Sequence, residues 1–532
     1  MDSTAPQQQQ LGQQTGLKIR YSVRELWDEF NNGNPQPLED LVRAWKGILE
    51  LDPSNPLSFF VIGGYHGEPF VGQGETDPAY WGGYCNHGNV LFPTWHRMYV
   101  QRIEEALQSI VPGVTMPYWD ETSQESIEKG VPAVLTDETF TFSDGTEIPN
   151  PLQSYTLQKA VNDNVTGDDQ RYTKPAGYAT VRYPLSGLVG TAEARAETET
   201  HNAQYQDPVQ RTTMLNNNYK AWLYKRVEPE DELSAAAGPE GILAKFRDCL
   251  DAPNYTAFSN TTSAQHWNVN NPGIVTPVES PHNEVHLAVG GFDVDGHEFG
   301  LVKGANGDMG ENNTAGLDPI FFFHHCNVDR MFWLWQVKNG HTDSIDIIKG
   351  DPGTNPNTLA QGGQGPAAGQ DPTMPLNMDT PLKPFLKDPS DPQSYYTSRD
   401  VVNLETQLGV TYSPGSLAGE QGLTESMLRK MTPGAKKLHV FGIDRQLFPG
   451  SFIINAFMHI DGKRVFLGRQ TILSRWNVSY CPNCQHHLMT SAFFDLSGFT
   501  LEQLKEADFE ITFQHRGEAM PQNLNYHVEV ID

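Results

Sequence analysis

The stretch DPIFFFHHCNVDR, residues 318–330, decides what kind of fold this chain adopts. Asp318-Pro319 is typical of a helix start, because aspartate caps a helix and proline suits its first turn. A phenylalanine run then leads to His324 and His325, whose side chains point about 100° apart on a helix. One of these histidines is therefore a candidate metal ligand, and the other is expected to make structural hydrogen bonds. Asp329 lies one turn after His325, where it can orient that ring or anchor the helix.

A second expected helix lies upstream and carries His282 and His286. Residues four apart share one helix face, about 6 Å apart at Cβ, so both imidazoles can reach one ion. Ser280 is the expected N-cap of this helix and Pro281 its first residue. Such a histidine pair is weak evidence alone, and other histidines must complete a metal site.

Three further histidines, His66, His87 and His96, form an upstream cluster. On one continuous helix His87 and His96 would lie on opposite faces, but Pro93 stands between them. We therefore expect His87 from a glycine-rich loop and His96 from a helix that begins near Pro93. Two groups of three histidines, each with a helical member among aromatic residues, predict a metal centre where the groups meet.

The residue types around these histidines narrow the choice of metal. Neutral imidazole binds copper, zinc, iron and nickel. Six histidines without a carboxylate ligand disfavour di-iron and di-manganese sites, and the zincin motif is absent because Asn283 follows His282. Copper is redox-active and highest in the affinity order, so a pair of three-histidine coppers fits best. A zinc hydrolase remains the alternative.

The chain divides by its periodicity into a mainly α part and a C-terminal β part. Helical periodicity marks the segments Leu38–Leu49, Met98–Ile110 and Phe321–Val337. After residue 435, β-rich runs are separated by turn signals, and Asp461-Gly462 predicts a hairpin. The predicted domains are a helical-bundle domain at 1–412, a linker at 413–434, and a β-sandwich at 435–532.

Composition restricts the partners. The net charge of -28 disfavours nucleic acid and acidic membrane surfaces and favours a small neutral or cationic ligand. The N-terminal segment lacks the apolar run of a secretory signal, so a cytoplasmic location is expected. The 5 cysteines are too few and too scattered for a disulfide framework. A homo-oligomer stays open.

Two blocks of sequence resemble the type 3 copper proteins, and specifically the fungal tyrosinases. The first block runs from YCNHG at 84–88 to FPTWHR at 92–97. The second joins SPHNEVH at 280–286 to the stretch at 318–330 quoted above. The resemblance covers about the first 400 residues. It implies an enzyme that uses two copper ions and dioxygen to ortho-hydroxylate monophenols and to oxidise o-diphenols to o-quinones, as in melanin formation.

The resemblance also assigns residues to roles. The first copper would bind His66, His87 and His96, and the second would bind His282, His286 and His325. The other assignments are a thioether from Cys85 to His87, a water held by Glu279 and Asn283 that deprotonates the phenol, and pocket aromatics at Phe92 and Phe321. The plainer roles are a buried free thiol for Cys85 and an ordinary helix N-terminal carboxylate for Glu279.

In the same family a C-terminal β domain keeps fungal pro-enzymes latent by inserting an apolar residue over the coppers. We expect that residue within Phe466–Leu473. The pair Cys481 and Cys484 resembles the thiols that such domains use to deliver copper, with a zinc half-site as the alternative. A catechol oxidase, an o-aminophenol oxidase and a haemocyanin-like oxygen carrier are the alternative functions.

Overall fold

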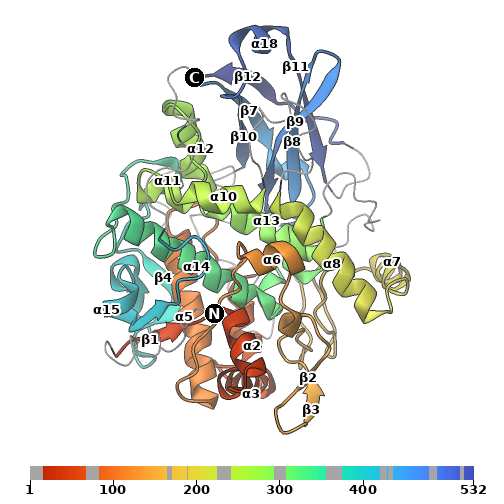
Figure 1. Cartoon of the computed structure of the whole chain (residues 1–532), viewed down its shortest axis with the longest axis vertical. Helices are drawn as coiled ribbons and strands as arrows, with labels where there is room; N and C mark the ends of the chain where they lie inside the picture. The colour runs from red at the N-terminus through yellow and green to blue at the C-terminus, as the bar shows by residue number, and fades with distance from the viewer. Residues whose placement is uncertain are drawn as a thin grey trace.

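The chain folds into a helical part and a β part that covers one end of it (Figure 1). The structure is a computed structural model, and it describes residues 16–67, 83–163, 170–187, 190–224, 241–292, 307–354, 374–419, 428, 435–478, 488–515 and 520–532. The helices are α2 (Val23–Asn31), α3 (Gln36–Glu50), α4 (Phe59–Gly64), α5 (Phe92–Ile110), α6 (Gln124–Lys129), α7 (Ala192–Asn202), α8 (Pro208–Leu223), α10 (Ile242–Cys249), α11 (Tyr255–Ser259), α12 (Thr261–Asn270), α13 (Glu279–Gly290), α14 (Ile320–Asn339), α15 (Leu404–Leu408) and α18 (Leu501–Glu506). The strands are β1 (Lys18–Arg20), β2 (Thr139–Thr141), β3 (Glu147–Pro149), β4 (Pro381–Leu386), β5 (Tyr395–Thr397), β6 (Val410–Tyr412), β7 (Lys437–Asp444), β8 (Phe452–Ile460), β9 (Lys463–Ile472), β10 (Met489–Asp495), β11 (Asp508–Gln514) and β12 (His527–Ile531).

The helical part is built around α14, which packs against α5. Every residue of α14 from Ile320 to Trp333 is buried, as expected for a helix that is apolar on all sides. Trp45 of α3 stacks on Phe323 with the ring centroids 5.1 Å apart. The three predicted helical segments are therefore confirmed, as α3, α5 and α14. Within the described ranges, no helix has the length and apolarity needed to cross a bilayer.

The predicted helix starts need correction. Helix α13 begins at Glu279 after Val278, and the predicted cap Ser280 already has its N–H bonded to the Pro277 carbonyl at 3.0 Å. Ser280 therefore lies inside the first turn and does not cap it. In α14 the N-cap is Pro319, while Asp318 still accepts a hydrogen bond from the N–H of Ile320 at 3.2 Å.

The β part is a sandwich of two three-stranded sheets, ordered β10-β7-β12 and β11-β8-β9. Apolar residues of both sheets, such as Leu438 and Ile454, form a core of their own between them. Strands β8 and β9 are joined by Asp461 and Gly462, whose φ angles are 52° and 73°. Positive φ at both residues is what a two-residue hairpin turn requires, so the predicted hairpin is confirmed.

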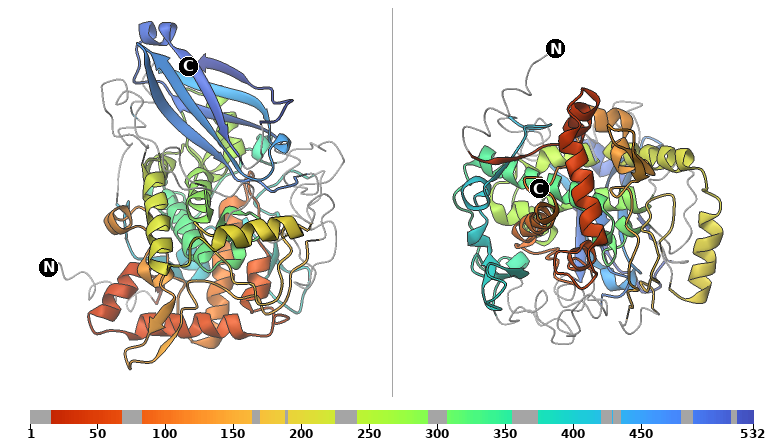
Figure 2. Two further views of the ribbon diagram at one scale, coloured as in Figure 1. Left: turned by 90° about the vertical axis from the view of Figure 1, so that its right-hand side faces the viewer. Right: turned by 90° about the horizontal axis from the view of Figure 1, so that it is seen from below.

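The β-sandwich sits at one end of the helical part (Figure 2), where β10 packs on α12 and β9 packs on α13. Lys245 of α10 also donates to the Arg469 carbonyl of β9 at 2.8 Å. Ile453 of β8 and Leu473, just after β9, belong to the apolar core of the helical part. Ser413, the first residue of the predicted linker, is buried, and its N–H donates to the Arg20 carbonyl at 3.0 Å. Ser416 donates from its N–H to Asp120 at 2.6 Å. The described start of the predicted linker, residues 413–419, is thus held on the helical domain.

Candidate metal centre

Five separate segments bring the six predicted ligands to the centre of the helical part. His66 follows α4, His87 lies in the loop before α5, His96 is in the first turns of α5, His282 and His286 are in α13, and His325 is in α14. All except His87 are fully or almost fully buried. As expected, Pro93 lies at the beginning of α5, so the loop histidine and the helical histidine of the first group approach from different directions.

The first group, His66, His87 and His96, is compact. Its ring centroids lie 5.1 Å apart for His66 and His87, 5.4 Å for His87 and His96, and 5.8 Å for His66 and His96. Three imidazoles at these distances can bind one ion between them. A small inward movement of the rings would suffice, because copper and zinc bind imidazole nitrogen at about 2 Å.

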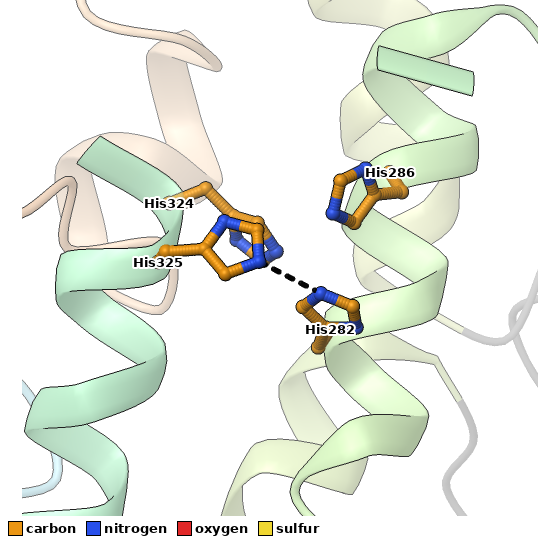
Figure 3. A group of neighbouring side chains, drawn as sticks. All are labelled: His282, His286, His324 and His325. Carbon is orange, nitrogen blue, oxygen red and sulfur yellow. Dashed lines mark hydrogen bonds between the residues drawn. The ribbon is translucent and has the colours of Figure 1, made fainter. Parts of the chain in front are cut away.

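The second group lies between α13 and α14 (Figure 3). Its ring centroids are 4.6 Å apart for His282 and His286, 4.9 Å for His282 and His325, and 5.3 Å for His286 and His325. The Nε2 atoms of His282 and His325 are 3.0 Å apart. Two nitrogens so close must share either a proton or a metal ion.

The two groups meet in space. The ring centroids of His96 in the first group and His325 in the second are 4.8 Å apart, and those of His87 and His282 are 5.3 Å apart. Residues from two distant stretches of chain therefore form one cluster of six imidazoles. This arrangement has room for two neighbouring ions, each with three histidines.

Hydrogen bonds set the orientation of the rings. The Nδ1 atoms of four histidines face main-chain carbonyls: His66 faces Asn312 at 3.1 Å, His96 faces Phe92, His286 faces Met309, and His325 faces Phe321, the last three at 2.8 Å. A carbonyl oxygen only accepts, so each Nδ1 carries the proton and each Nε2 keeps its lone pair for a metal. His282 uses the side-chain oxygen of Asn283 in the same way, at 2.9 Å.

The Nε2 atoms of His66, His96 and His286 are buried and have no hydrogen-bond partner among the described residues. Burial lowers the pKa of His96 to about 3 and that of His286 to about 4, and it also keeps the pKa of His66 well below its usual value. These histidines are therefore neutral at pH 7, which is the form that binds a metal. Buried, unpartnered lone pairs on neutral imidazoles fit copper ions.

In each of two helices, a phenylalanine packs on the histidine that follows it by one turn. In α5, Phe92 packs on His96 with the rings 4.5 Å apart, and in α14, Phe321 stacks on His325 at 3.8 Å. Each phenylalanine stands four residues before its histidine, so its carbonyl and its ring both fix the orientation of that imidazole. Both phenylalanines are fully buried against the cluster.

Glu279 and Asn283 both lie beside His282 in α13. One Glu279 oxygen accepts from the N–H of Gly88 at 2.8 Å, and the other accepts from the N–H and hydroxyl of Thr261 at 2.8 and 3.0 Å. Burial raises the pKa of Glu279, although these hydrogen bonds oppose the shift. The carboxylate therefore ties the His87 loop to α13, in addition to any role as a base.

Cys85 is buried beside the first group, where its Sγ and nitrogens of His66 and His87 all lie within 4.8 Å of one another. The side chain of Arg475, from the β part, donates to this sulfur at 3.6 Å. Cys481 and Cys484 lie outside the described residues, so their predicted role stays a prediction.

The structure also shows contacts that the sequence did not reveal. His324, the expected structural histidine, has its Nδ1 2.5 Å from the carboxylate of Glu121. Asp329 does not contact the His325 ring; it pairs with Arg97 at 2.5 Å and Arg20 at 3.3 Å and so anchors the helix. Glu121 stands in no motif, and only its position in space connects it with the histidines.

The β part reaches the centre through arginines. Arg475 donates from Nη1 to the side-chain oxygen of Asn313, next to Asn312, whose carbonyl holds His66. Arg469 of β9 lies 3.7 Å from Glu284, which stands between His282 and His286 in α13 and pairs with Lys245 at 2.6 Å. An apolar residue within Phe466–Leu473 is expected over the metals, and of this segment Leu473 belongs to the apolar core of the helical part.

A helical core with six converging, neutral, inward-facing imidazoles defines a dinuclear metalloprotein with histidine ligands. Residues 56–338 match the family model of the common central domain of tyrosinase. The chain is 52% identical to tyrosinase HcTyr2 of Hahella sp. over 95% of this chain and 93% of that protein. It is 38% identical to a tyrosinase of Aspergillus oryzae over 90% of this chain and 88% of that one. The chain therefore belongs to the tyrosinase family.

Solved structures agree with this assignment. A tyrosinase of Burkholderia thailandensis superposes with a TM-score of 0.83 at 51% sequence identity, covering 97% of this chain and 100% of that one. An Aspergillus oryzae pro-tyrosinase superposes with a TM-score of 0.62 at 19% identity over 97% and 93% of the two chains, which shows the fold alone. Both bacterial proteins are more similar to this chain than the fungal ones, so the comparisons support the family but not a fungal character.

The family membership confirms the predicted class of activity and cofactor. The protein is an enzyme that oxidises phenols with dioxygen, and its cofactor is a dinuclear copper centre. The fold prediction, a mainly α domain with a C-terminal β-sandwich, is confirmed as well.

Proposed function

We propose that His66, His87 and His96 hold one copper and that His282, His286 and His325 hold the other. The observation that carries this assignment is that carbonyl oxygens face Nδ1 of His66, His96, His282, His286 and His325, which keeps the Nε2 lone pair of each ring for a metal. When bound, the two coppers supply the dioxygen chemistry that oxidises the phenol. The protein fixes the imidazoles, keeps them neutral, and surrounds them with Phe92 and Phe321.

We further propose that the enzyme acts on monophenols as well as on o-diphenols. A phenol has a pKa near 10 and must lose its proton to bind a metal at neutral pH. Glu279 lies one turn before Asn283, and its raised pKa makes it a stronger base than an ordinary carboxylate. Glu279 would take the proton through a water that Asn283 helps to position.

The experiment that tests this function measures copper and two activities on the same sample. Two coppers per chain, with oxidation of both tyrosine and a catechol, are expected. Oxidation of the catechol alone would leave a catechol oxidase or an o-aminophenol oxidase, and oxygen binding without turnover would favour a carrier. Zinc in place of copper would contradict the proposal altogether.

We propose that the β-sandwich keeps the enzyme latent. Support comes from Ile453 and Leu473, which enter the core of the helical part, and from Arg475, which reaches Asn313 beside the first histidine group. The test is a specific protease site introduced between residues 420 and 434. A cut there leaves Ser413 and Ser416 on the helical domain, where their hydrogen bonds hold the chain. Catechol oxidation should rise after cleavage, and an unchanged rate would contradict latency.

A thioether between Cys85 and His87 is also proposed. The buried sulfur lies close to the imidazole, and copper with dioxygen can act as the oxidant that removes one hydrogen from each partner. Peptide mass spectrometry after copper loading should show a cross-linked peptide that lacks two hydrogens. Free alkylation of Cys85 in the fully loaded enzyme would argue against the bond.

A further inference from the structure

Glu121 is a fully buried carboxylate directly behind the second histidine group. One of its oxygens lies 2.5 Å from Nδ1 of His324, and the other accepts a hydrogen bond from Asn327 at 3.1 Å. The His324 ring stacks on that of His282, with the centroids 5.2 Å apart and the planes 23° apart. His324 projects from α14 beside His325 towards the same gap between the helices (Figure 3). One imidazole thus connects Glu121 with the proposed second copper site.

Four other buried carboxylates of the helical part have a cationic partner, whereas Glu279 is held by the neutral donors of Gly88 and Thr261. Glu104 pairs with Arg20 at 2.8 Å, Asp318 with Arg182 at 2.6 Å, Glu284 with Lys245 at 2.6 Å, and Asp329 with Arg97 at 2.5 Å. Within the described part of the chain, Glu121 forms no ion pair with lysine or arginine. Its closest link to a cation runs through Asn327, whose oxygen accepts from Arg330 at 3.4 Å. Arg330 itself donates to the carbonyls of Pro414 and Ser416.

A buried carboxylate without a cation is costly, because charge is poorly solvated in the interior. Burial accordingly raises the pKa of Glu121 in the metal-free chain. The proposed ligands are six neutral imidazoles, which bring no negative charge to the metals. A copper pair bound there adds positive charge to the same interior, where electrostatic interactions are stronger than in water.

We propose that Glu121 is the fixed counter-charge of the second copper, acting through His324 as a positioning residue. This inference depends on the proposed copper ligands and extends them. Because Cu(II) carries one more charge than Cu(I), a fixed anion stabilises the oxidised ion more. Glu121 therefore sets the balance between the two oxidation states at one of the two coppers.

The test replaces Glu121→Gln and titrates the two coppers against competing chelators, once as Cu(I) without oxygen and once as Cu(II). One copper is expected to lose about 10-fold to 100-fold in Cu(II) affinity, with a much smaller change for Cu(I). Equal losses for both ions would show that Glu121 only supports the fold, and unchanged affinities would also overturn the proposal. Circular dichroism confirms that the variant is folded.

A second variant returns the charge nearby. Asn327 already donates to Glu121 at 3.1 Å, so the double variant Glu121→Gln, Asn327→Asp reverses that hydrogen bond and restores one carboxylate. It should recover most of the lost Cu(II) preference, and failure to recover it would count against a counter-charge. The matched control is Asp251→Asn, which removes a buried carboxylate that pairs with Lys338 at the far end of α14 and should leave the Cu(II) preference unchanged. A wild-type chain that binds fewer than two coppers would instead contradict the proposed function itself.

Discussion

His282 donates its Nδ1 hydrogen bond to the side chain of Asn283 at 2.9 Å, whereas four other histidines of the cluster use main-chain carbonyls. A main-chain carbonyl cannot be removed by substitution. Asn283 is therefore the place where the orientation of a proposed ligand can be altered by mutation.

Asn283→Ala should weaken one of the two coppers about 10-fold to 100-fold, because the His282 ring loses the partner that fixes its tautomer. Copper titration against a chelator measures the effect. Asn283→Asp keeps an acceptor and should retain most of the affinity. Asn270→Ala, which removes an exposed amide bonded to the His266 carbonyl, is the control and should change nothing.

Glu279→Gln should separate the two activities. Glutamine can accept at one oxygen only, so the N–H of either Gly88 or Thr261 loses its acceptor, at a cost of about 1–3 kcal/mol. If Glu279 is the base, the rate of tyrosine oxidation falls about 100-fold or more, while catechol oxidation falls much less. Parallel assays of both substrates decide the matter, since equal losses would show a structural role.

Asp329→Asn should destabilise the fold without altering the metal ligands. Asp329 accepts from Arg97 at 2.5 Å and from the Tyr412 hydroxyl at 2.6 Å. The side chains of Asp329 and Arg97 are both fully buried. Leaving buried Arg97 without its anion costs about 3–5 kcal/mol, which urea unfolding would detect. Asp379→Asn breaks an exposed pair with Arg399 and should give no measurable change.

Arg475→Ala tests the contact between the β part and the first histidine group. Its loss removes the hydrogen bonds to Asn313 and to the Cys85 sulfur, so the uncleaved enzyme should oxidise catechol several times faster. A charged hydrogen bond of about 1.5–3 kcal/mol is large enough for that effect. Arg464→Ala, in the same domain but paired with Glu510 at the surface, should leave the rate unchanged. An Arg475 variant as latent as the parent would remove this contact from the latency proposal.

The copper-free protein should lose stability in mild acid. Burial lowers the pKa of His96 to about 3 and of His286 to about 4, while an unfolded histidine titrates near 6.5. Below about pH 6.5 the unfolded chain therefore binds protons that the folded chain does not, and the free energy of unfolding falls with decreasing pH. The contribution of His286 should stop falling near pH 4 and that of His96 near pH 3. Urea midpoints of the apoprotein between about pH 7 and pH 4 measure it, and the variant His96→Phe, His286→Phe should show a shallower fall.

Local pattern was sufficient for the helices, the hairpin and the grouping of the histidines. The period of a helix puts His282 and His286 on one face, and Pro93 separates the loop of His87 from the helix of His96. Asp461-Gly462 predicts the hairpin turn because such a turn needs positive φ at two successive residues, and few residue pairs other than Asp-Gly and Asn-Gly adopt it readily. The misplaced N-cap at Ser280 shows the limit of such rules, since contacts at Pro277 and Phe258 start that helix earlier.

The sequence by itself determined which side chains can bind metal and on which faces of their helices they stand, because spacing along a helix is a local property. Only the tertiary structure decided which atoms surround them. Asn312 and Met309 orient His66 and His286 from segments distant in the chain, and Glu121 comes behind the second group from a turn without any motif. Packing of the helices brings these partners together, and no spacing rule along one segment encodes a contact between segments.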